Sequence, residues 1–288
     1  ILENILPRIN IILTGSGLDL EPSILTKTRD LKLIQTLSAG VDTLPFDKIP
    51  RNVLICSNAG GNAVAVAEHV FALMLTAIKR IIYHHDNMRR GIWCRRKYGF
   101  MLYGKKLGIL GLGNVGREVA KIGRCFGMYI YAINRSGRTD IDVDFTGTIK
   151  DLEYILKISD IIVICLPLNK HTRGLIGEKE LKLMKRNAIL INVSRGGIID
   201  QHALYNHLRE NPEFIACLDV WWKYPSKGSE MCLQDYPFHE LPNVIMTPHI
   251  AGFTLEIRRM VLSHALENIL RFIQGEKPIN IINRDDYI

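Results

Sequence analysis

Three side chains suited to anion binding or acid–base chemistry, Arg195, Asp219 and His249, each follow a short apolar run of the chain. An arginine binds a carboxylate through two parallel hydrogen bonds, and a histidine can exchange a proton with an alcohol or a carbonyl while a hydride moves. In open α/β sheets, ligands bind outside the carboxyl ends of the strands. If the apolar runs are parallel strands, these three residues are candidates for catalysis.

A glycine pattern earlier in the chain suggests what would supply the hydride. Gly111, Gly113 and Gly116 follow the strand-like run 107–110 and open a helical pattern that continues to about residue 126. The first glycine of this pattern permits a tight turn, the second lets the backbone approach a pyrophosphate, and the third allows close helix–strand packing. The strand, the spacing and the helix together predict a dinucleotide site, with a glycine-rich turn that binds nothing as the alternative.

The residues after the next strand bear on which dinucleotide is bound. NAD sites usually have a carboxylate about twenty residues after the glycines, where it contacts the ribose hydroxyls. Here the run 129–133 ends in Asn134, Arg135 and Ser136, without an acid. Because these side chains can bind an adenosine phosphate, we expect NADP(H), and NAD(H) bound without the usual carboxylate is the alternative.

The elements that must position these residues are strand-length apolar runs alternating with helical patterns, as in α/β proteins with parallel sheets. The predicted strands are 9–13, 32–37, 53–56, 107–110, 129–133, 161–166, 189–193, 215–218 and 244–246. Long helical patterns at 64–82 and 255–273 flank the central block of strands. We therefore expect a dinucleotide-binding domain at 62–252, inserted into a substrate domain formed by 1–61 and 253–288.

Composition excludes several other classes of protein. The chain has 288 residues, 47% of them hydrophobic, which is enough for two domains with cores of their own. Its net charge of +8 comes from scattered Lys and Arg, so nucleic acid is not expected as a partner. The six cysteines form no C-x-x-C pair, no metal site is expected, and no apolar run is long enough to span a membrane. We expect a cytoplasmic protein with buried, reduced thiols.

Seven segments together make the chain resemble the D-isomer-specific 2-hydroxyacid dehydrogenase family, which includes glycerate, glyoxylate and phosphoglycerate dehydrogenases. The segments are 38–42, 61–69, 111–116, 166–168 with Thr172, 192–196, 218–220 and 247–251. The resemblance covers nearly the whole chain. It implies a Rossmann-type doubly wound parallel sheet inserted into a smaller, shortened flavodoxin-like α/β substrate domain.

The resemblance also implies roles for individual residues. Arg195 would hold the substrate carboxylate and polarise the keto group, and His249 would be the acid in reduction and the base in oxidation. Ala39, Gly40 and Val41 would offer backbone donors to the substrate, with Asn62 nearby, and Asp219 would face the nicotinamide. The expected cofactor-binding set is Gly111, Gly113, Asn114, Val115, Gly116, Asn134, Arg135, Ser136, Leu166, Pro167, Thr172, Val193, Ser194, Asp219, His249 and Ala251.

One residue departs from the family pattern. Tyr224 stands where most members have a glutamate that hydrogen-bonds the catalytic histidine, and the loss of that charge should lower the pKa of His249. Glu230, Asp235 or Glu240 could replace it from the following loop.

The expected reaction is reduction of a small 2-keto acid, with glyoxylate and hydroxypyruvate ranked ahead of phosphoglycerate substrates. Formate dehydrogenases also lack the glutamate, so formate oxidation is an alternative. A dinucleotide-sensing binding protein of the same fold is another. The long helix from residue 64 resembles the arm through which family members dimerise, so we expect a homodimer.

Overall fold

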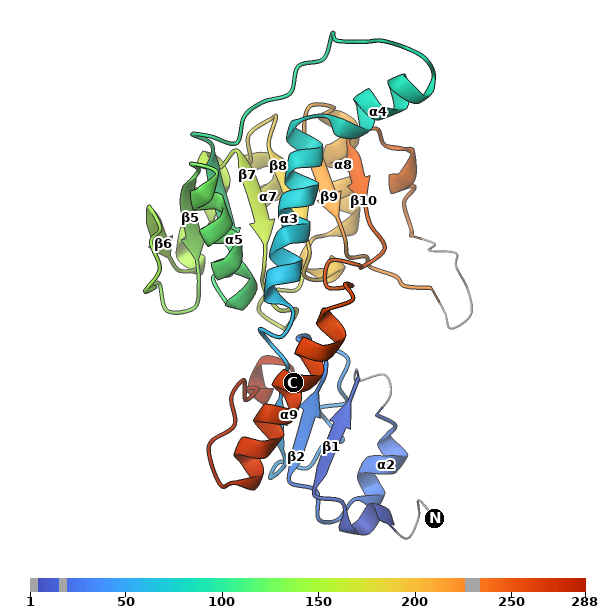
Figure 1. The fold of residues 1–288 in the computed structure, drawn as a ribbon, viewed down its shortest axis with the longest axis vertical. Helices are drawn as coiled ribbons and strands as arrows, with labels where there is room; N and C mark the ends of the chain where they lie inside the picture. The colour runs from blue at the N-terminus through green and yellow to red at the C-terminus, as the bar shows by residue number, and fades with distance from the viewer. Residues whose placement is uncertain (1–4, 16–19, 226–233) are drawn as a thin grey trace. The chain divides into compact units, whose positions relative to one another are not determined.

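The computed structural model describes residues 5–15, 20–225 and 234–288. The chain divides into two compact units. Unit 1 consists of Ile1–Ala63, Pro167–His171 and Phe253–Ile288, and unit 2 of Val64–Leu166 and Thr172–Gly252. Each is an α/β unit built around its own parallel sheet (Figure 1).

Unit 2 contains a seven-stranded parallel sheet in the order β10-β9-β8-β7-β4-β5-β6. Its strands are β4 (Lys106–Leu110), β5 (Tyr129–Ile133), β6 (Phe145–Gly147), β7 (Ile161–Ile164), β8 (Ile189–Asn192), β9 (Ile215–Leu218) and β10 (Val244–Met246). The chain runs outward from β4 to β6, then returns to β7 on the other side of β4. The strand order therefore reverses between β4 and β7, and doubly wound sheets bind their ligands at such a reversal.

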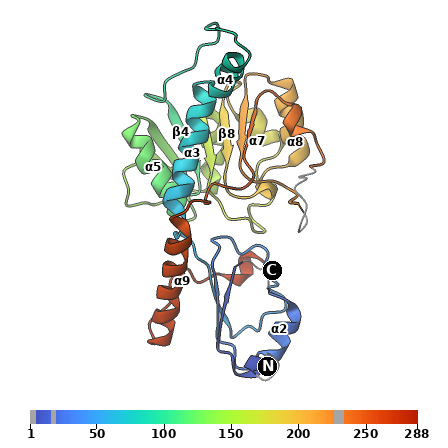
Figure 2. The ribbon, with the colours of Figure 1, turned by 45° about the vertical axis from the view of Figure 1, so that its right-hand side comes forward.

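Helices cover both faces of this sheet (Figures 1 and 2). On one face, α3 (Ala63–Ile78) and α5 (Asn114–Cys125) pack with the strands in one apolar cluster, in which Val70, Met74 and Val119 are fully buried. The other helices of the unit are α4 (Ile81–Arg89), α6 (Leu152–Ile158), α7 (Glu178–Leu183) and α8 (Gln201–Glu210). Short 3₁₀ turns lie at Ile149–Asp151, Gly196–Ile198 and Phe238–Glu240.

Unit 1 is smaller and has a three-stranded parallel sheet in the order β1-β2-β3. Its elements are β1 (Ile11–Thr14), α2 (Pro22–Lys27), β2 (Leu33–Thr36), β3 (Leu54–Cys56) and α9 (Ile257–Ile273), with 3₁₀ turns at Leu6–Arg8 and Arg284–Asp286. The buried Asn268 of α9 donates to Gln35 Oε1 at 2.7 Å, which links this late helix to the early strands.

The predicted fold class is confirmed, and several details differ. Arg80 adopts a left-handed conformation with φ of 54° and ends the helix expected at 64–82, so α3 and α4 are separate. Strand β6 was not predicted, because Phe-Thr-Gly is too short and too polar to signal a strand. In the sequence, the first boundary between the two compact units falls between residues 63 and 64, and Pro167–His171 groups with unit 1. No helix among the described residues is long and apolar enough to cross a membrane.

Candidate active site

The glycine-rich turn after β4 needs its glycines for close backbone approaches. Gly111 has a φ of 102°, and a Cβ atom there would lie 2.7 Å from the Cys165 carbonyl oxygen beyond β7. A Cβ atom on Gly116 would collide with the Gly111 carbonyl, so α5 can begin this close to the strand only with glycine. Nothing lies within 4 Å of the corresponding position on Gly113. The turn therefore leaves open space beside the first N–H groups of α5, where an anion is favoured.

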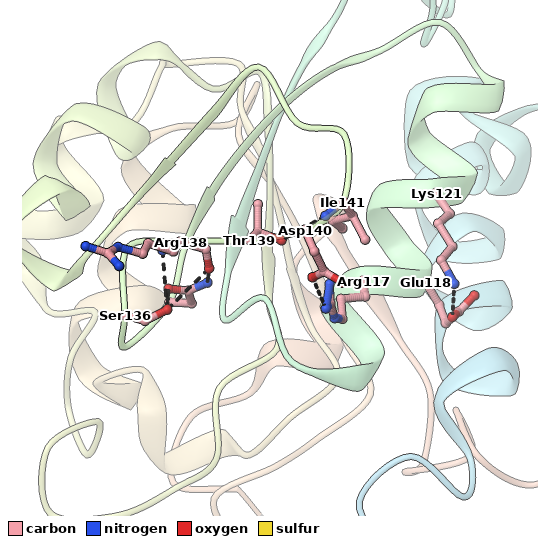
Figure 3. A network of polar contacts seen from close by, with 9 residues as sticks. Arg117, Glu118, Lys121, Ser136, Arg138, Thr139, Asp140 and Ile141 are labelled. Carbon is pink, nitrogen blue, oxygen red and sulfur yellow. Dashed lines mark hydrogen bonds and ion pairs between the residues drawn. The ribbon is translucent and has the colours of Figure 1, made fainter.

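The turn after β5 is held by its own side chains (Figure 3). Asn134 Oδ1 accepts from the Gly137 N–H at 2.7 Å, and Asn134 Nδ2 donates to the Arg138 carbonyl at 2.8 Å. The Ser136 hydroxyl lies 3.2 Å from Asn134 Oδ1. The turn is thus preformed, and both polar atoms of the Asn134 side chain already have partners within it.

The charges around this turn favour an anion. Arg135 and Arg138 are exposed, and Asn134 leaves no acid at the strand end. Asp140 follows later in the loop, but its carboxylate is paired with Arg117 of α5 (Figure 3). The loop therefore presents arginines where an NAD site has its carboxylate.

Arg195 lies just beyond β8, at a turn that a buried asparagine organises. The Asn192 side chain accepts from the Ser194 N–H at 3.1 Å and donates to the Arg195 carbonyl at 2.9 Å. The Ser194 hydroxyl donates to the Ile164 carbonyl of β7 at 2.9 Å. A Cβ atom on Gly196 would collide with the Trp221 backbone, so the chain needs glycine directly after Arg195. Arg195 is half-buried on a backbone fixed from both sides.

His249 lies in the loop after β10, in a left-handed conformation with φ of 59°. This conformation costs a residue other than glycine about 1–2 kcal/mol, although histidine adopts it more often than most. The buried carboxylate of Asp219 accepts from the N–H groups of Ile250 and Ala251 at 2.8 and 2.9 Å. It also accepts from the Thr247 hydroxyl at 2.6 Å. Asp219 thus binds the loop on both sides of His249 and stabilises its strained backbone.

Tyr224 is the aromatic neighbour of His249. The two ring centroids lie 5.4 Å apart with the planes tilted by 40°. The Tyr224 hydroxyl accepts from the Trp221 N–H at 3.3 Å. Where most of the family is expected to have a carboxylate, this histidine therefore packs against a neutral ring.

Two of the three acids considered as substitutes for the missing glutamate have ionic neighbours of their own. Asp235 is ion-paired with Lys223, and Glu240 Oε1 lies 4.0 Å from His239 Nε2. Glu230 lies outside the described residues. The recorded ion pairs of Asp235 and Glu240 are thus with Lys223 and His239.

The segment 38–41 of unit 1 forms a compact turn after β2. The Ser38 hydroxyl donates to the Gly40 carbonyl at 2.6 Å, and the Ser38 carbonyl accepts from the Asn58 N–H at 3.0 Å. Within the described residues, no acceptor contacts the backbone N–H groups of Ala39, Gly40 or Val41. Asn62 is half-buried just before α3. The turn therefore has backbone donors available for an anion.

The remaining predicted cofactor residues lie around the same end of the unit 2 sheet or next to it in sequence. Asn114 and Val115 form the first turn of α5, and Leu166 and Val193 are half-buried beyond β7 and β8. Pro167 is exposed and belongs to the short segment grouped with unit 1, whereas Thr172 is half-buried in unit 2. No group of three or more described His, Cys, Asp or Glu residues is arranged to hold a metal.

Sequence reasoning missed Asn192, Thr247 and His69 as parts of the site. His69 Nε2 lies 3.1 Å from Thr247 Oγ1 and 3.6 Å from Asp219 Oδ1. A polar residue ending an apolar strand was a usable signal for Asn192. His69 ends the family segment 61–69, but nothing local signals its role, because its partners lie about 150 residues or more away in the sequence.

The fold and the glycine turn define unit 2 as a dinucleotide-binding α/β protein with ionisable side chains at the strand ends. Residues 71–251 match the model of the D-isomer specific 2-hydroxyacid dehydrogenase NAD-binding domain. Glyoxylate reductase of Aeropyrum pernix is 36% identical over 271 residues, which cover 91% of this chain and 79% of that protein. The chain belongs to the D-isomer-specific 2-hydroxyacid dehydrogenase family, as its motifs predicted.

Solved structures agree with this assignment. A putative formate dehydrogenase from Pyrobaculum aerophilum has a TM-score of 0.83 and 36% identity, with 93% of this chain and 87% of that one covered. D-lactate dehydrogenase of Aquifex aeolicus, complexed with NAD and lactic acid, has a TM-score of 0.80 and 29% identity, with 95% and 86% covered. The prediction of an NAD(P)-dependent D-2-hydroxyacid dehydrogenase acting on CH–OH donors is confirmed.

Proposed function

We propose that this dehydrogenase reduces small 2-keto acids, with glyoxylate and hydroxypyruvate as preferred substrates and NADPH as the preferred cofactor. The proposal is carried by the placement of Arg195 and His249 beyond β8 and β10, on either side of β9 in one parallel sheet. The Arg195 guanidinium can bind a carboxylate, and the His249 imidazole can give a proton to a carbonyl oxygen. The similarity to a glyoxylate reductase supports the choice of substrate.

In this proposal Arg195 binds and orients the substrate carboxylate through its guanidinium group. The backbone N–H groups of Ala39, Gly40 and Val41 serve as further donors to the substrate, with Asn62 nearby. His249 donates a proton to the keto oxygen as negative charge develops there, and it accepts that proton back in the oxidative direction. The nicotinamide cofactor supplies the hydride, so that keto acid, NADPH and one proton give hydroxy acid and NADP⁺.

The Arg195→Ala variant tests the substrate site. We expect kcat/KM for glyoxylate to fall by a factor of about 10³, because a charge-assisted bidentate contact is lost, together with its alignment of the carbonyl. The Kd for NADPH, measured by fluorescence titration, should stay within about twofold of wild type, and Arg186→Ala on the surface of unit 2 serves as the control. Retained activity in Arg195→Ala would contradict the role.

The preference for NADPH rests on the exposed Arg135 and on the absence of an acid at Asn134. Because a guanidinium–phosphate contact is charge-assisted, Arg135→Ala should weaken NADPH binding by about tenfold and NADH binding much less. The comparison of both Kd values in one buffer tests this directly. Equal losses of affinity for NADPH and NADH in Arg135→Ala would contradict the proposed preference.

Formate oxidation is a second candidate, because Tyr224 supplies no carboxylate beside His249 and hydride removal from formate requires no proton transfer by that histidine. A solved neighbour is itself described as a putative formate dehydrogenase. Formate-dependent reduction of NAD⁺ and NADP⁺, assayed beside glyoxylate reduction across pH 5 to 9, separates the two reactions. Cofactor binding without turnover of either substrate would favour the dinucleotide-sensing alternative.

We also propose a homodimer, formed through α4 and the segment that follows it. The long helix α3, expected from sequence to be the dimerisation arm, packs largely into the core of unit 2. Large apolar side chains are instead exposed beyond α4, where Trp93, Tyr98 and Tyr103 are 77%, 84% and 76% exposed. Such a surface is typical of an interface. Light scattering of wild type and a Trp93→Glu/Tyr98→Glu variant tests it, and an unchanged mass in the variant would contradict it.

A further inference from the structure

The backbone conformation of His249 depends on hydrogen bonds between its loop and the side chain of Asp219. Asp219 is fully buried and accepts three hydrogen bonds, from Thr247, Ile250 and Ala251. These bonds hold a backbone that would otherwise leave the left-handed region at His249. Any group that fixes the Asp219 carboxylate and the Thr247 hydroxyl therefore also fixes His249.

His69 of α3 is such a group. Its side chain is 17% exposed, and its Nε2 atom lies 3.1 Å from Thr247 Oγ1 and 3.6 Å from Asp219 Oδ1. An ionised carboxylate only accepts hydrogen bonds, so the Thr247 hydroxyl gives its proton to Asp219. The Thr247 oxygen is then left to accept, and His69 must carry a proton on Nε2 to donate to it. The three groups form one directed chain from His69 through Thr247 to Asp219.

We propose that His69 is a positioning residue, which orients His249 by holding Thr247 and Asp219. The inference rests on the proposed role of His249 as proton donor. Helix α3 is anchored in the apolar core of unit 2 by Val70 and Met74, so the His69 ring is presented from a rigid support. His69 also places a donor beside a carboxylate that has no solvent to stabilise its charge.

The experiment compares His69→Leu, which removes the donor, with His69→Gln, whose amide can donate to Thr247. In His69→Leu we expect kcat for glyoxylate reduction to fall by about ten- to a hundredfold, because small displacements of a catalytic group cost about that much. The Kd for NADPH should stay within about twofold of wild type. His69→Gln should recover most of the lost kcat, and the exposed His239→Gln, in the same unit, should match wild type.

Hydrogen exchange of the peptide containing Ile250 and Ala251 gives a readout independent of turnover. These amides should exchange faster in His69→Leu and at the wild-type rate in His69→Gln. If His69→Leu fails to fold, Thr247→Val interrupts the same chain and Thr247→Ser restores it. Wild-type exchange in His69→Leu, or parallel loss of activity and NADPH binding, would overturn the inference. Absence of wild-type turnover with any substrate would instead count against the proposed function.

Discussion

The substitution Tyr224→Glu should move the alkaline limb of keto-acid reduction to higher pH. In the proposed mechanism His249 must be protonated for reduction, and a carboxylate beside the ring favours the imidazolium form and raises its pKa. The ring centroids are 5.4 Å apart, and Tyr224 is 48% exposed, so water screens the new charge. At effective dielectric constants of about 40–80, two unit charges at that separation interact by about 0.8–1.5 kcal/mol. This corresponds to a rise of about 0.6–1.1 pKa units.

The assay is kcat/KM for glyoxylate with NADPH across pH 5 to 9, at low and high salt. The limb should move upward by about half a unit to one unit in Tyr224→Glu, and high salt should shrink the shift because both groups are near the surface. Tyr224→Gln has nearly the same shape as the glutamate variant without its charge, so it should show no upward shift. The electrostatic reasoning is refuted if the glutamate variant keeps the wild-type limb, or if the glutamine variant shifts it equally.

Two further predictions concern the scaffold. Gly113→Ala should leave the melting temperature unchanged, because the added Cβ meets only open space, yet weaken dinucleotide binding at least tenfold; Gly196→Ala should cost about 1–3 kcal/mol of stability, because its Cβ collides with backbone that cannot yield. At Asp160, burial raises the pKa, but the Lys106 N–H and the Lys185 ammonium outweigh it and hold the pKa below its ordinary value. The stability that Asp160 contributes is therefore present above the unfolded pKa of about 3.9 and is lost as the pH falls through the folded value. When the free energy of unfolding is measured against pH, the Asp160→Asn variant should not show this part of the acid-dependent decrease.

Local patterns predicted every strand of the unit 2 sheet except β6, because each of the others is an apolar run bounded by turn residues. The glycine turn was predictable in detail for the same reason: its geometry depends on contacts within one strand–turn–helix unit. Gly116 is required because the Gly111 carbonyl, five residues earlier, lies too close for a side chain. Gly111 is required because the Cys165 carbonyl, just beyond the neighbouring strand β7, also lies too close for one. The break between α3 and α4 was not predictable, since Arg80 is a good helix former that adopts a left-handed conformation here.

The site itself depends on contacts that no local pattern encodes. The role of Asn192 could be read from its place at a strand end, but the chain from His69 to Thr247 joins residues 178 positions apart. Tyr224 was identified as a departure from the family pattern, whereas its ring contact with His249 required the fold. Residue types at strand ends are thus readable from sequence, and the groups that orient them are not.

Asp219 shows why that distinction matters for function. The family resemblance implies that its carboxylate faces the nicotinamide, yet the side chain is fully buried and accepts hydrogen bonds from Thr247, Ile250 and Ala251. A carboxylate has about four acceptor positions, so three hydrogen bonds and a histidine at 3.6 Å leave it little capacity for another ligand. Asp219→Asn would keep one side-chain oxygen and replace the other with an NH₂ group, so either the Ile250 or the Ala251 N–H would face a donor instead of an acceptor. Its first effect should therefore fall on the conformation of His249, and any effect on cofactor binding should be secondary.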